Sequence, residues 1–287
     1  MITKILSQQL PTDYEKFKNN IFSQNGEDGV IEYFLQKMQI STGYFVEFGA
    51  WDGMHLSNCA NLAKHGWSGC FIEGDSERFT DLQKNYSTYS SIKLVNCFVR
   101  RHGDSSLDSI LNSVNAPEII DVLSIDIDGD DHAIWDSISS HQVRLLVIEF
   151  NPTIPANLVV IQEEKDDANF GSSLGALWEL GNTKGFRLVA VTASNAFFLP
   201  NTECEKFSIP TFKPWDLKDT TFETFLFHGY NGELKLSGNK MLVWHGINIT
   251  ENQLQIIPKN LRKIPVGQTP EYYKELESYK KSIEKKC

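Results

Sequence analysis

Acidic and amide side chains stand at the ends of five successive apolar stretches of this chain. In sequence order these side chains are Glu47 and Asp52, Glu73 and Asp75, Asn96, Asp126 and Asp128, and Glu149 and Asn151. Carboxylates accept hydrogen bonds from hydroxyl and ammonium groups, and their oxygens are ligands for hard divalent cations. A single acid in such a place is usually solvated surface. Five in succession indicate a binding site.

The first of these stretches is Tyr44–Gly53, with the sequence YFVEFGAWDG. An apolar run leads through Glu47 into a turn with Gly49 and Gly53, where main chain can approach a ligand closely. A tight strand–helix turn would explain the same pattern without any ligand. The spacing Glu-x-Gly-x-x-x-Gly differs from the G-x-G-x-x-G of dinucleotide-binding proteins, which argues against a nicotinamide cofactor.

Strands and helices alternate along the first half of the chain. We expect strands near residues 44–49, 70–75, 92–99, 121–128 and 143–150, and helices near 57–65, 76–86, 107–114 and 133–139. Because each strand is a near-continuous apolar run, the pattern predicts a parallel sheet covered by helices. Ligands of such sheets bind beyond the carboxyl ends of the strands.

The remaining segments flank this alternating core. A short helix is expected near residues 13–20, and residues 23–28 read either as a helix cap or as a loop over a ligand. The segment of residues 152–171 is too long for an ordinary loop between a strand and a helix, so we expect it to form a lid or a wall of the acceptor site. A helix at 172–184 precedes a hairpin of two strands, 187–192 and 196–199. Strands or capping loops are expected at 225–230 and 241–246, and a helix at 270–286.

Composition excludes several classes of function. The 287 residues carry a net charge of −10, which argues against nucleic acid and anionic membrane as partners. No run reaches the length of a membrane span, and the N-terminus lacks the apolar core of a signal peptide. Five cysteines without a CxxC motif indicate reduced thiols. We expect a cytoplasmic protein with one domain over 1–287, its core at about 22–200 and a C-terminal extension at 201–287.

The spacing of the acids indicates the kind of ligand. An acid at the end of the second strand is placed to accept hydrogen bonds from a ribose diol, and Glu73 takes that position. The turn before it offers no cradle for a pyrophosphate. Glu47 and Asp52 instead suit a cationic adenosine ligand such as S-adenosylmethionine, which carries an ammonium, a sulfonium and a ribose.

Six stretches together carry a family resemblance. They are SQNGEDG (23–29), VEFGAWDG (46–53), GWSGCFIEGD (66–75), LSIDIDGDDHAIW (123–135), VIEFNPTIP (147–155) and VAVTASNAFFLP (189–200). They resemble class I S-adenosylmethionine-dependent methyltransferases, and most of all the FkbM-like family, over about residues 22–200. The first motif departs from the family pattern, whose glycine-rich segment is usually longer than Gly49-x-x-x-Gly53.

The resemblance implies both a fold and a reaction. The fold is a Rossmann-like seven-stranded α/β sandwich, mostly parallel, with a terminal antiparallel hairpin. The reaction is O-methylation of a hydroxyl on a sugar or other natural product, in surface polysaccharide (capsule) or natural-product biosynthesis. The acceptor would be a small molecule or a glycan, and the sequence leaves a homodimer open.

The resemblance also assigns the cofactor contacts. The methionine end would lie near Glu47, Gly49, Asp52, Ser57 and Asp126, the ribose near Glu73, and the adenine near Asn96, Cys97 and Phe98, with Gln24 as an additional contact.

Methyl transfer to an alcohol needs the acceptor oxygen in line with the sulfonium and a means of removing its proton. His132, four residues beyond the fourth strand, is the candidate base, with His55 as the alternative. We expect the neighbouring aspartates to raise the pKa of His132, and a bound cation to lower it. Asp128, Glu149 and Asn151 resemble the ligand set of metal-dependent O-methyltransferases, which would hold Mg²⁺ or Mn²⁺ and give Asp128 a catalytic role. Helix capping by these acids and a solvated histidine are the purely structural explanations.

Two other functions remain open from the sequence. One is a nicotinamide-dependent oxidoreductase on the same kind of sheet. The other is a cofactor-binding protein that has no catalytic activity.

Overall fold

The computed structural model describes residues 12–162 and 169–284. The chain divides into two compact units, one extending to Asp219 and one beginning at Thr220. Each is described here by itself, and the single domain expected over residues 1–287 stays a prediction.

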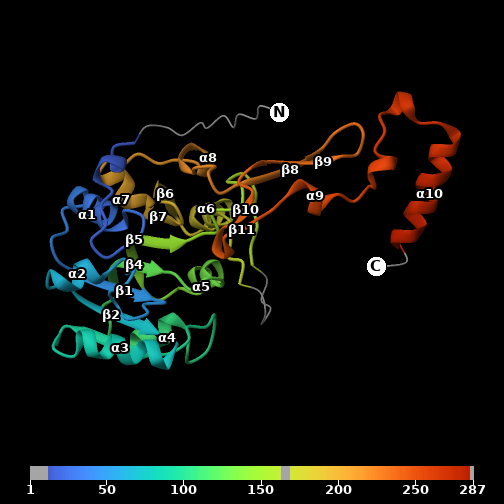
Figure 1. Cartoon of the computed structure of the whole chain (residues 1–287). Helices are drawn as coiled ribbons and strands as arrows, with labels where there is room; N and C mark the ends of the chain where they lie inside the picture. The colour runs from blue at the N-terminus through green and yellow to red at the C-terminus, as the bar shows by residue number, and fades with distance from the viewer. Residues whose placement is uncertain (1–11, 163–168, 285–287) are drawn as a thin grey trace. The chain divides into compact units, whose positions relative to one another are not determined.

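A seven-stranded sheet in the order β3-β2-β1-β4-β5-β7-β6 forms the centre of the first unit (Figure 1). Its strands are β1 (Tyr44–Phe48), β2 (Ser68–Glu73), β3 (Ile92–Asn96), β4 (Ile119–Ile125), β5 (Gln142–Glu149), β6 (Phe186–Val191) and β7 (Asn195–Pro200). The pairings among β1 to β5 are parallel. Only β7 runs antiparallel to both of its neighbours, β5 and β6. The predicted mostly parallel sheet with a terminal antiparallel hairpin is therefore confirmed.

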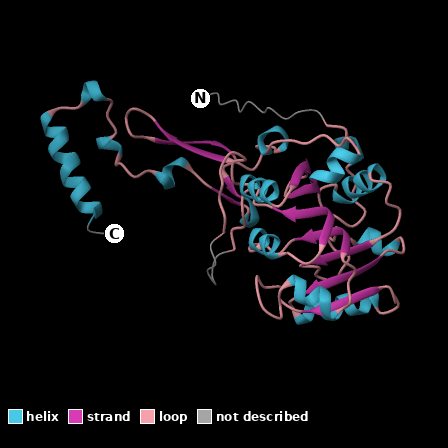
Figure 2. Cartoon of the chain, turned by 180° about the vertical axis from the view of Figure 1, so that it is seen from behind, coloured by secondary structure: helices cyan, strands magenta, loops and turns pink. Residues whose placement is uncertain are grey.

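Helices connect the strands and lie to either side of the sheet (Figure 2). They are α1 (Glu27–Lys37), α2 (Ala60–Lys64), α3 (Ser76–Tyr86), α4 (Leu107–Ser113), α5 (Asp131–Ser137), α6 (Leu174–Thr183), α7 (Asn201–Lys206) and α8 (Pro214–Leu217), preceded by the 3-10 turn η1 (Tyr14–Phe17). Large side chains such as Phe45, Phe71 and Trp135 are almost fully buried between the layers. This burial on both faces explains why the strands read as continuous apolar runs.

Several elements are shorter than predicted, and two of these differences have a local explanation. The helix expected from residue 57 begins at Ala60, because Ser57 Oγ accepts a bond from the Ala60 N–H (2.9 Å) and residues 57–59 form a turn before the helix. The strand expected to reach residue 99 ends at Asn96, whose neighbour in the sheet is Glu73, the last residue of β2. Beyond Asn96 the chain has no strand partner on that side.

The second unit contains the antiparallel hairpin of β8 (Thr224–His228) and β9 (Leu234–Gly238), and the short pair β10 (Met241–Leu242) and β11 (Ile247–Asn248). Its helical segments are η2 (Val243–His245), α9 (Glu251–Leu254), η3 (Lys259–Leu261), η4 (Pro265–Gly267) and α10 (Pro270–Glu284). The predicted strand at 225–230 corresponds to β8, whereas the stretch at 241–246 is divided between the short strand β10 and the 3-10 turn η2. Across residues 12–162 and 169–284, no helix combines the length and apolarity needed to cross a membrane.

Candidate functional site at the carboxyl edge of the sheet

Gly49 brings the end of β1 into direct contact with the end of β4. It has a φ of +74°, and a Cβ atom at this position would lie 1.7 Å from the main-chain oxygen of Asp126. No side chain fits between the two segments, and L-residues rarely adopt this conformation. Glycine is therefore required here to close the carboxyl edge of the sheet.

Glu47 holds the loop that follows this glycine. Its side chain is 4% exposed, and it accepts hydrogen bonds from Ser57 Oγ (2.6 Å) and from the backbone N–H groups of Asn58 (2.9 Å) and Cys59 (3.2 Å). Burial raises the pKa of Glu47 to about 7, although these hydrogen bonds act in the opposite direction. Glu47 and Ser57, both predicted cofactor contacts, thus bind each other, and together they fix the start of α2.

Glu73 joins the ends of β1 and β2. It is buried, and its two carboxylate oxygens accept hydrogen bonds from the backbone N–H groups of Trp51 and Asp75, each at 2.7 Å. A carboxylate has about four acceptor positions, so each oxygen retains the capacity to accept a further bond from a ribose hydroxyl.

The residues predicted for the adenine side lie next to Glu73. Asn96 Nδ2 donates to the main-chain oxygen of Glu73 (2.8 Å), and Cys97 follows, half-buried. The ring of Phe98 is 64% exposed and lies against Gly74, where a Cβ atom would be 2.2 Å from Phe98 Cδ1. An exposed aromatic ring held beside the second strand is a surface on which a purine can stack.

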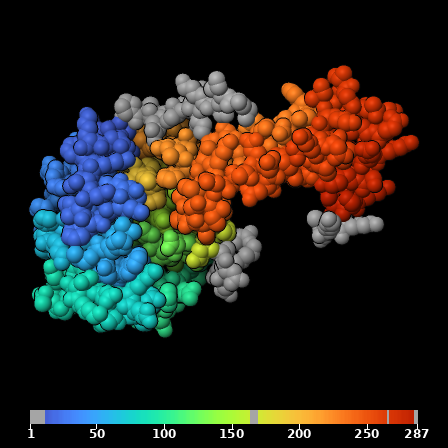
Figure 3. Space-filling view, viewed as in Figure 1, coloured from blue at the N-terminus to red at the C-terminus, as the bar shows by residue number. Residues whose placement is uncertain are grey.

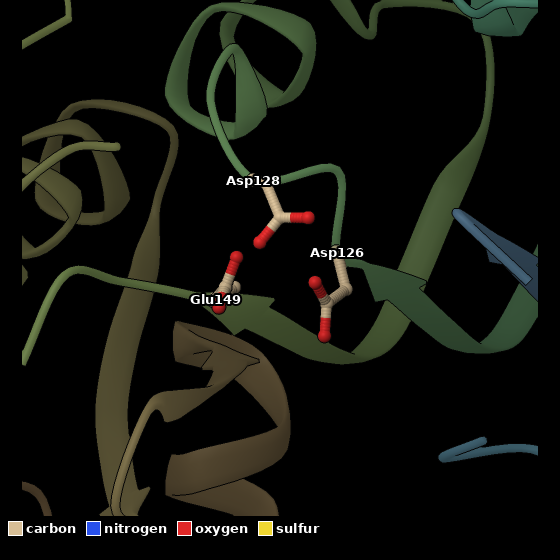
Figure 4. A group of neighbouring side chains, drawn as sticks. All are labelled: Asp126, Asp128 and Glu149. Carbon is tan, nitrogen blue, oxygen red and sulfur yellow. The ribbon is translucent and has the colours of Figure 1, made fainter. Parts of the chain in front are cut away.

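Asp126, Asp128 and Glu149 converge between the ends of β4 and β5 (Figure 4). One carboxylate oxygen from each lies within 4.8 Å of the other two. Asp126 and Glu149 share a hydrogen bond, and burial, followed by the repulsion of neighbouring acids, raises the pKa of both well above the ordinary range. A group of hard oxygen ligands that repel one another is suited to bind a divalent cation.

Asn151, the third predicted metal ligand, has its polar atoms bonded elsewhere. Its Oδ1 accepts hydrogen bonds from the Thr153 N–H (2.9 Å) and Thr153 Oγ1 (2.6 Å), and its Nδ2 donates to the main-chain oxygen of Phe170 (2.6 Å). The amide therefore shapes the loop after β5. Asp126 lies with Asp128 and Glu149 in the group of converging carboxylates, and a metal-binding role of Asn151 stays a prediction.

Asp131 was not singled out from the sequence, yet it determines the shape of the turn that carries Asp128. Its buried carboxylate accepts hydrogen bonds from the backbone N–H groups of Ile127 and Gly129, both at 2.9 Å. Burial raises its pKa to about 6. Asp128 itself has a φ of +57°. The sequence signal for this role was the position of Asp131, two residues after Gly129 and just before a predicted helix.

His132 lies in the first turn of α5 and is half-buried. Burial is the largest influence and lowers its pKa, Asp136 acts in the opposite direction, and Arg101 lowers it further. The expectation that neighbouring aspartates raise this pKa is therefore wrong. Burial and the Arg101 guanidinium outweigh them and favour the neutral imidazole, the form that a base requires. The alternative base, His55, is exposed in the loop after β1.

Two predicted cofactor contacts lie on loops near the edge. Asp52 is half-buried, and its Oδ1 accepts hydrogen bonds from the backbone N–H groups of Met54 (2.9 Å) and His55 (2.7 Å). Gln24 is exposed, and its main-chain oxygen accepts a bond from Asn20 Nδ2 (2.8 Å). Neither side chain is hydrogen-bonded to the acids of the strand ends in the described part of the chain.

The N-terminal segment is nevertheless fastened to this edge. Glu27, at the start of α1, is fully buried and accepts a hydrogen bond from Thr192 Oγ1 (2.6 Å), just after β6. In the sheet, Asn195 pairs with Glu149. Glu27, which the sequence analysis did not assign, thus holds the start of α1 near the end of β5, where Glu149 lies.

Comparisons with known proteins were made at the level of sequence and of structure. No family model matches the chain, and no curated protein matches it. Among solved structures, the chain is similar to M. capricolum TrmK in complex with S-adenosylhomocysteine, with a TM-score of 0.34 and 12% identity over 58% of this chain and 66% of that one. It is also similar to a SAM-dependent methyltransferase from Aquifex aeolicus (TM-score 0.36, 11% identity, 64% of this chain and 94% of that one). A third is an S-adenosylmethionine-dependent methyltransferase from Clostridium acetobutylicum (TM-score 0.40, 9% identity, 66% and 92%).

The fold is that of class I methyltransferases. This assignment depends on the strand order and on the single antiparallel strand of the sheet, not on the similarity values.

Proposed function

We propose that this protein is an S-adenosylmethionine-dependent methyltransferase that methylates a hydroxyl group of a sugar or sugar-derived acceptor. The observation that carries the proposal is the carboxyl edge of the seven-stranded sheet, where Gly49 allows close main-chain approach and Glu47 and Glu73 end adjacent strands. Ligands of open α/β sheets bind at this edge. Binding of an adenosine with a cationic methionine end makes use of both acids.

The cofactor would lie across the ends of β1, β2 and β4. Glu73 would accept hydrogen bonds from the ribose hydroxyls, and the exposed ring of Phe98 would stack on the adenine. Glu47 and Asp126 would lie near the ammonium and sulfonium groups, whose positive charge would favour the ionised form of both carboxyl groups. The acidic character of the edge favours a cationic cofactor over the anionic pyrophosphate of a nicotinamide dinucleotide.

A divalent cation fits the group of Asp126, Asp128 and Glu149. These three carboxylates would hold Mg²⁺ or Mn²⁺, and the cation would relieve the repulsion that raises the pKa of Asp126 and Glu149. When bound, such a cation supplies a positive charge that favours deprotonation of an acceptor hydroxyl. The other contacts to the acceptor would come from protein side chains.

His132 and the loop of residues 152–171 would form the acceptor side. The half-buried imidazole would take the hydroxyl proton in its neutral form. Residues 163–168 of the loop lie outside the described residues, but the residues on either side of them reach the turn that carries Asp128: a Cβ atom at Gly129 would lie 2.8 Å from Gln162 Nε2 and 3.5 Å from Asn169 Oδ1. Amide side chains in this place suit the hydroxyl groups of a sugar. The sugar-modifying activity of the FkbM-like family, which the motifs resemble, is consistent with this acceptor class.

Two measurements test the proposal. Mass spectrometry of the denatured, freshly purified protein is expected to detect S-adenosylmethionine or S-adenosylhomocysteine. A methyl-transfer assay with free and nucleotide-linked sugars is then expected to give methylated product. Cofactor binding without turnover on any acceptor would favour a non-catalytic cofactor-binding protein. Bound NADH, with no affinity for S-adenosylhomocysteine, would favour an oxidoreductase and refute the proposal.

A further inference from the structure

The hairpin of β8 and β9 is a two-stranded sheet of its own within the second unit (Figure 1). At one end the Asn239 N–H donates to the main-chain oxygen of Glu223 (2.8 Å). At the other end the Gly229 N–H donates to the main-chain oxygen of Glu233 (2.9 Å). Because hydrogen-bonded pairs alternate along an antiparallel ladder, the odd-numbered residues of β8 bond to β9, and the backbone groups of its even-numbered residues point away from β9.

The outer edge of β9 is covered by side chains from α9 and from the residue that follows it. Gln255 bonds to both backbone groups of Leu234, since its Oε1 accepts from the Leu234 N–H (3.0 Å) and its Nε2 donates to the Leu234 oxygen (2.8 Å). The Leu236 N–H donates to Glu251 Oε1 (3.3 Å). These bonds satisfy backbone groups that would otherwise be open to a further strand.

The outer edge of β8 has no such cover. Within the described part of the chain, the outward backbone groups of Thr224, Leu226 and His228 make no hydrogen bond. The side chains of Leu226 and Phe227 along this strand are 58% and 41% exposed. Lysine and proline are the residues that commonly protect an open edge from pairing, and the sequence from Thr224 to Asn231, TFLFHGYN, contains neither.

The second unit also exposes more apolar side chains than it buries. Among its described residues the buried large apolar side chains are Leu236, Leu261 and Tyr272, whereas eleven are exposed. These eleven are Leu226, Phe227, Tyr230, Met241, Leu242, Trp244, Ile247, Ile256, Ile264, Val266 and Tyr273. Their exposed area is on the order of 1,000 Å², which is comparable with the ~800 Å² that each partner buries in a stable interface. In the space-filling view the segment of β8 and β9 is part of the orange surface (Figure 3).

The open edge of β8 is complementary to itself. When a second β8 lies antiparallel to it with a two-fold axis at Leu226, each Leu226 pairs with its counterpart and each Thr224 pairs with a His228, so all of the outward backbone groups are bonded. On the other face each Phe225 lies opposite a Phe227 of the other copy, and aromatic pairs of this kind stabilise antiparallel strands.

The charge of this segment also favours a second copy as the partner. Charges close to a two-fold axis meet their own counterparts and repel one another. The sequence TFLFHGYN carries no Lys, Arg, Asp or Glu, so two copies meet without this repulsion. A charged peptide would find no countercharge on the same edge.

We propose that this chain forms a two-fold symmetric homodimer, in which β8 of one copy pairs antiparallel with β8 of the other and Leu226 lies at the axis. The product is a continuous four-stranded sheet in the order β9-β8-β8-β9. Two strands alone are only marginally stable, and a sheet of three or more is stable. The proposal requires no methyl-transfer activity, so its test is independent of the proposed function.

The first test is sedimentation velocity of the full chain over a concentration series, which is expected to show a reversible equilibrium between the monomer and a species of twice its mass. Leu226→Lys and Leu226→Glu each place two like charges against each other at the axis, and each is expected to weaken dimerisation by about tenfold or more. An equimolar mixture of these two variants places opposite charges there and is expected to recover the dimer. This recovery occurs only where Leu226 meets its own counterpart.

Two controls accompany these variants. Ile119→Lys changes the net charge by the same amount at a strand residue of the first unit that is 47% exposed, and it is expected to keep the wild-type dissociation constant. Amide hydrogen exchange followed by NMR is expected to slow at the Leu226 N–H as the dimer forms, whereas exchange of the Leu234 N–H, which is bonded to Gln255 in each copy, is expected to stay the same.

Several results would overturn the proposal. They are a wild type that stays monomeric at every concentration, unchanged dimerisation of folded Leu226→Lys, an equal loss in Ile119→Lys, and no recovery in the mixture. Slow exchange at Leu226 in a monomeric wild type would show that a segment of the same chain covers the edge, and it would overturn the proposal as well.

Discussion

Substitution of Gly49 by alanine tests how the carboxyl edge is closed. The added Cβ would lie 1.7 Å from the main-chain oxygen of Asp126, an atom that no side-chain rotation can move away. The φ of +74° costs an L-residue about 1–2 kcal/mol, and forcing an extra methyl group into a packed place costs about 1–3 kcal/mol more. Gly49→Ala is therefore expected to lower the free energy of unfolding by about 2–5 kcal/mol.

Gly103 supplies a matched control, because it has a φ of +82° and no atom within 4 Å of an added Cβ. Gly103→Ala carries only the conformational cost of about 1–2 kcal/mol. Urea denaturation of the two variants and the wild type measures the stability difference, and calorimetry with S-adenosylhomocysteine measures cofactor affinity. Gly49→Ala is expected to lose cofactor affinity as well, since the turn must move away from β4, whereas Gly103→Ala keeps it. Equal stability and equal affinity of the two variants would refute the steric argument.

Three further predictions concern the individual roles in the site. Glu73→Ala is expected to weaken S-adenosylhomocysteine binding by about 1.5–3 kcal/mol, the scale of a lost hydrogen bond to a charged group, and unchanged calorimetric affinity would remove Glu73 from the site. Activity is expected to fall in EDTA and to return with Mg²⁺ or Mn²⁺, with Glu149→Gln losing this dependence; full activity in the chelator would argue for a metal-free reaction. His132→Ala is expected to lower turnover by about 10²–10⁴ with little change in cofactor affinity. Because the pKa of His132 is lowered, the wild-type rate is expected to reach its plateau at a lower pH than a histidine with the ordinary pKa would give, and a rate that still rises at alkaline pH would point to another base.

The strand ends illustrate what the sequence could predict. Apolar runs and the parallel alternation place Glu47 and Glu73 at one edge, because side chains that end neighbouring parallel strands must meet there. The antiparallel hairpin followed from two adjacent β-rich runs with a short turn. These features depend on local sequence and on topology, which residue patterns report well.

Side-chain direction could not be predicted in the same way. Asn151 and Asp126 are both polar residues near strand ends, but Thr153 and Phe170 engage the amide of Asn151, whereas the carboxylate of Asp126 lies with those of Asp128 and Glu149. The predicted shift in the pKa of His132 had the wrong direction. The prediction counted nearby acids and ignored burial, which only the packed structure reveals.

Because of Glu47, the stability of the first unit is expected to decrease as the pH rises. An acid whose pKa is lowered by a salt bridge has the opposite effect. Burial raises its pKa from 4.5 to about 7, so the folded state binds the proton more tightly than the unfolded chain does. The associated stability is fully present below about pH 4.5 and is lost as the pH rises through about 7, a change of about 3 kcal/mol.

The free energy of unfolding in urea, measured at about pH 5 and about pH 8, is therefore expected to fall more in the wild type than in Glu47→Gln, which cannot titrate at this position. Glu77→Gln, at an exposed residue in the first turn of α3, controls for the loss of one negative charge and is expected to keep the wild-type pH dependence. Because the other buried acids titrate in all three proteins, the difference between wild type and Glu47→Gln isolates the contribution of Glu47. The same pH dependence in these two proteins would show that Glu47 remains ionised at little cost, held by Ser57, Asn58 and Cys59, and that burial does not dominate its pKa.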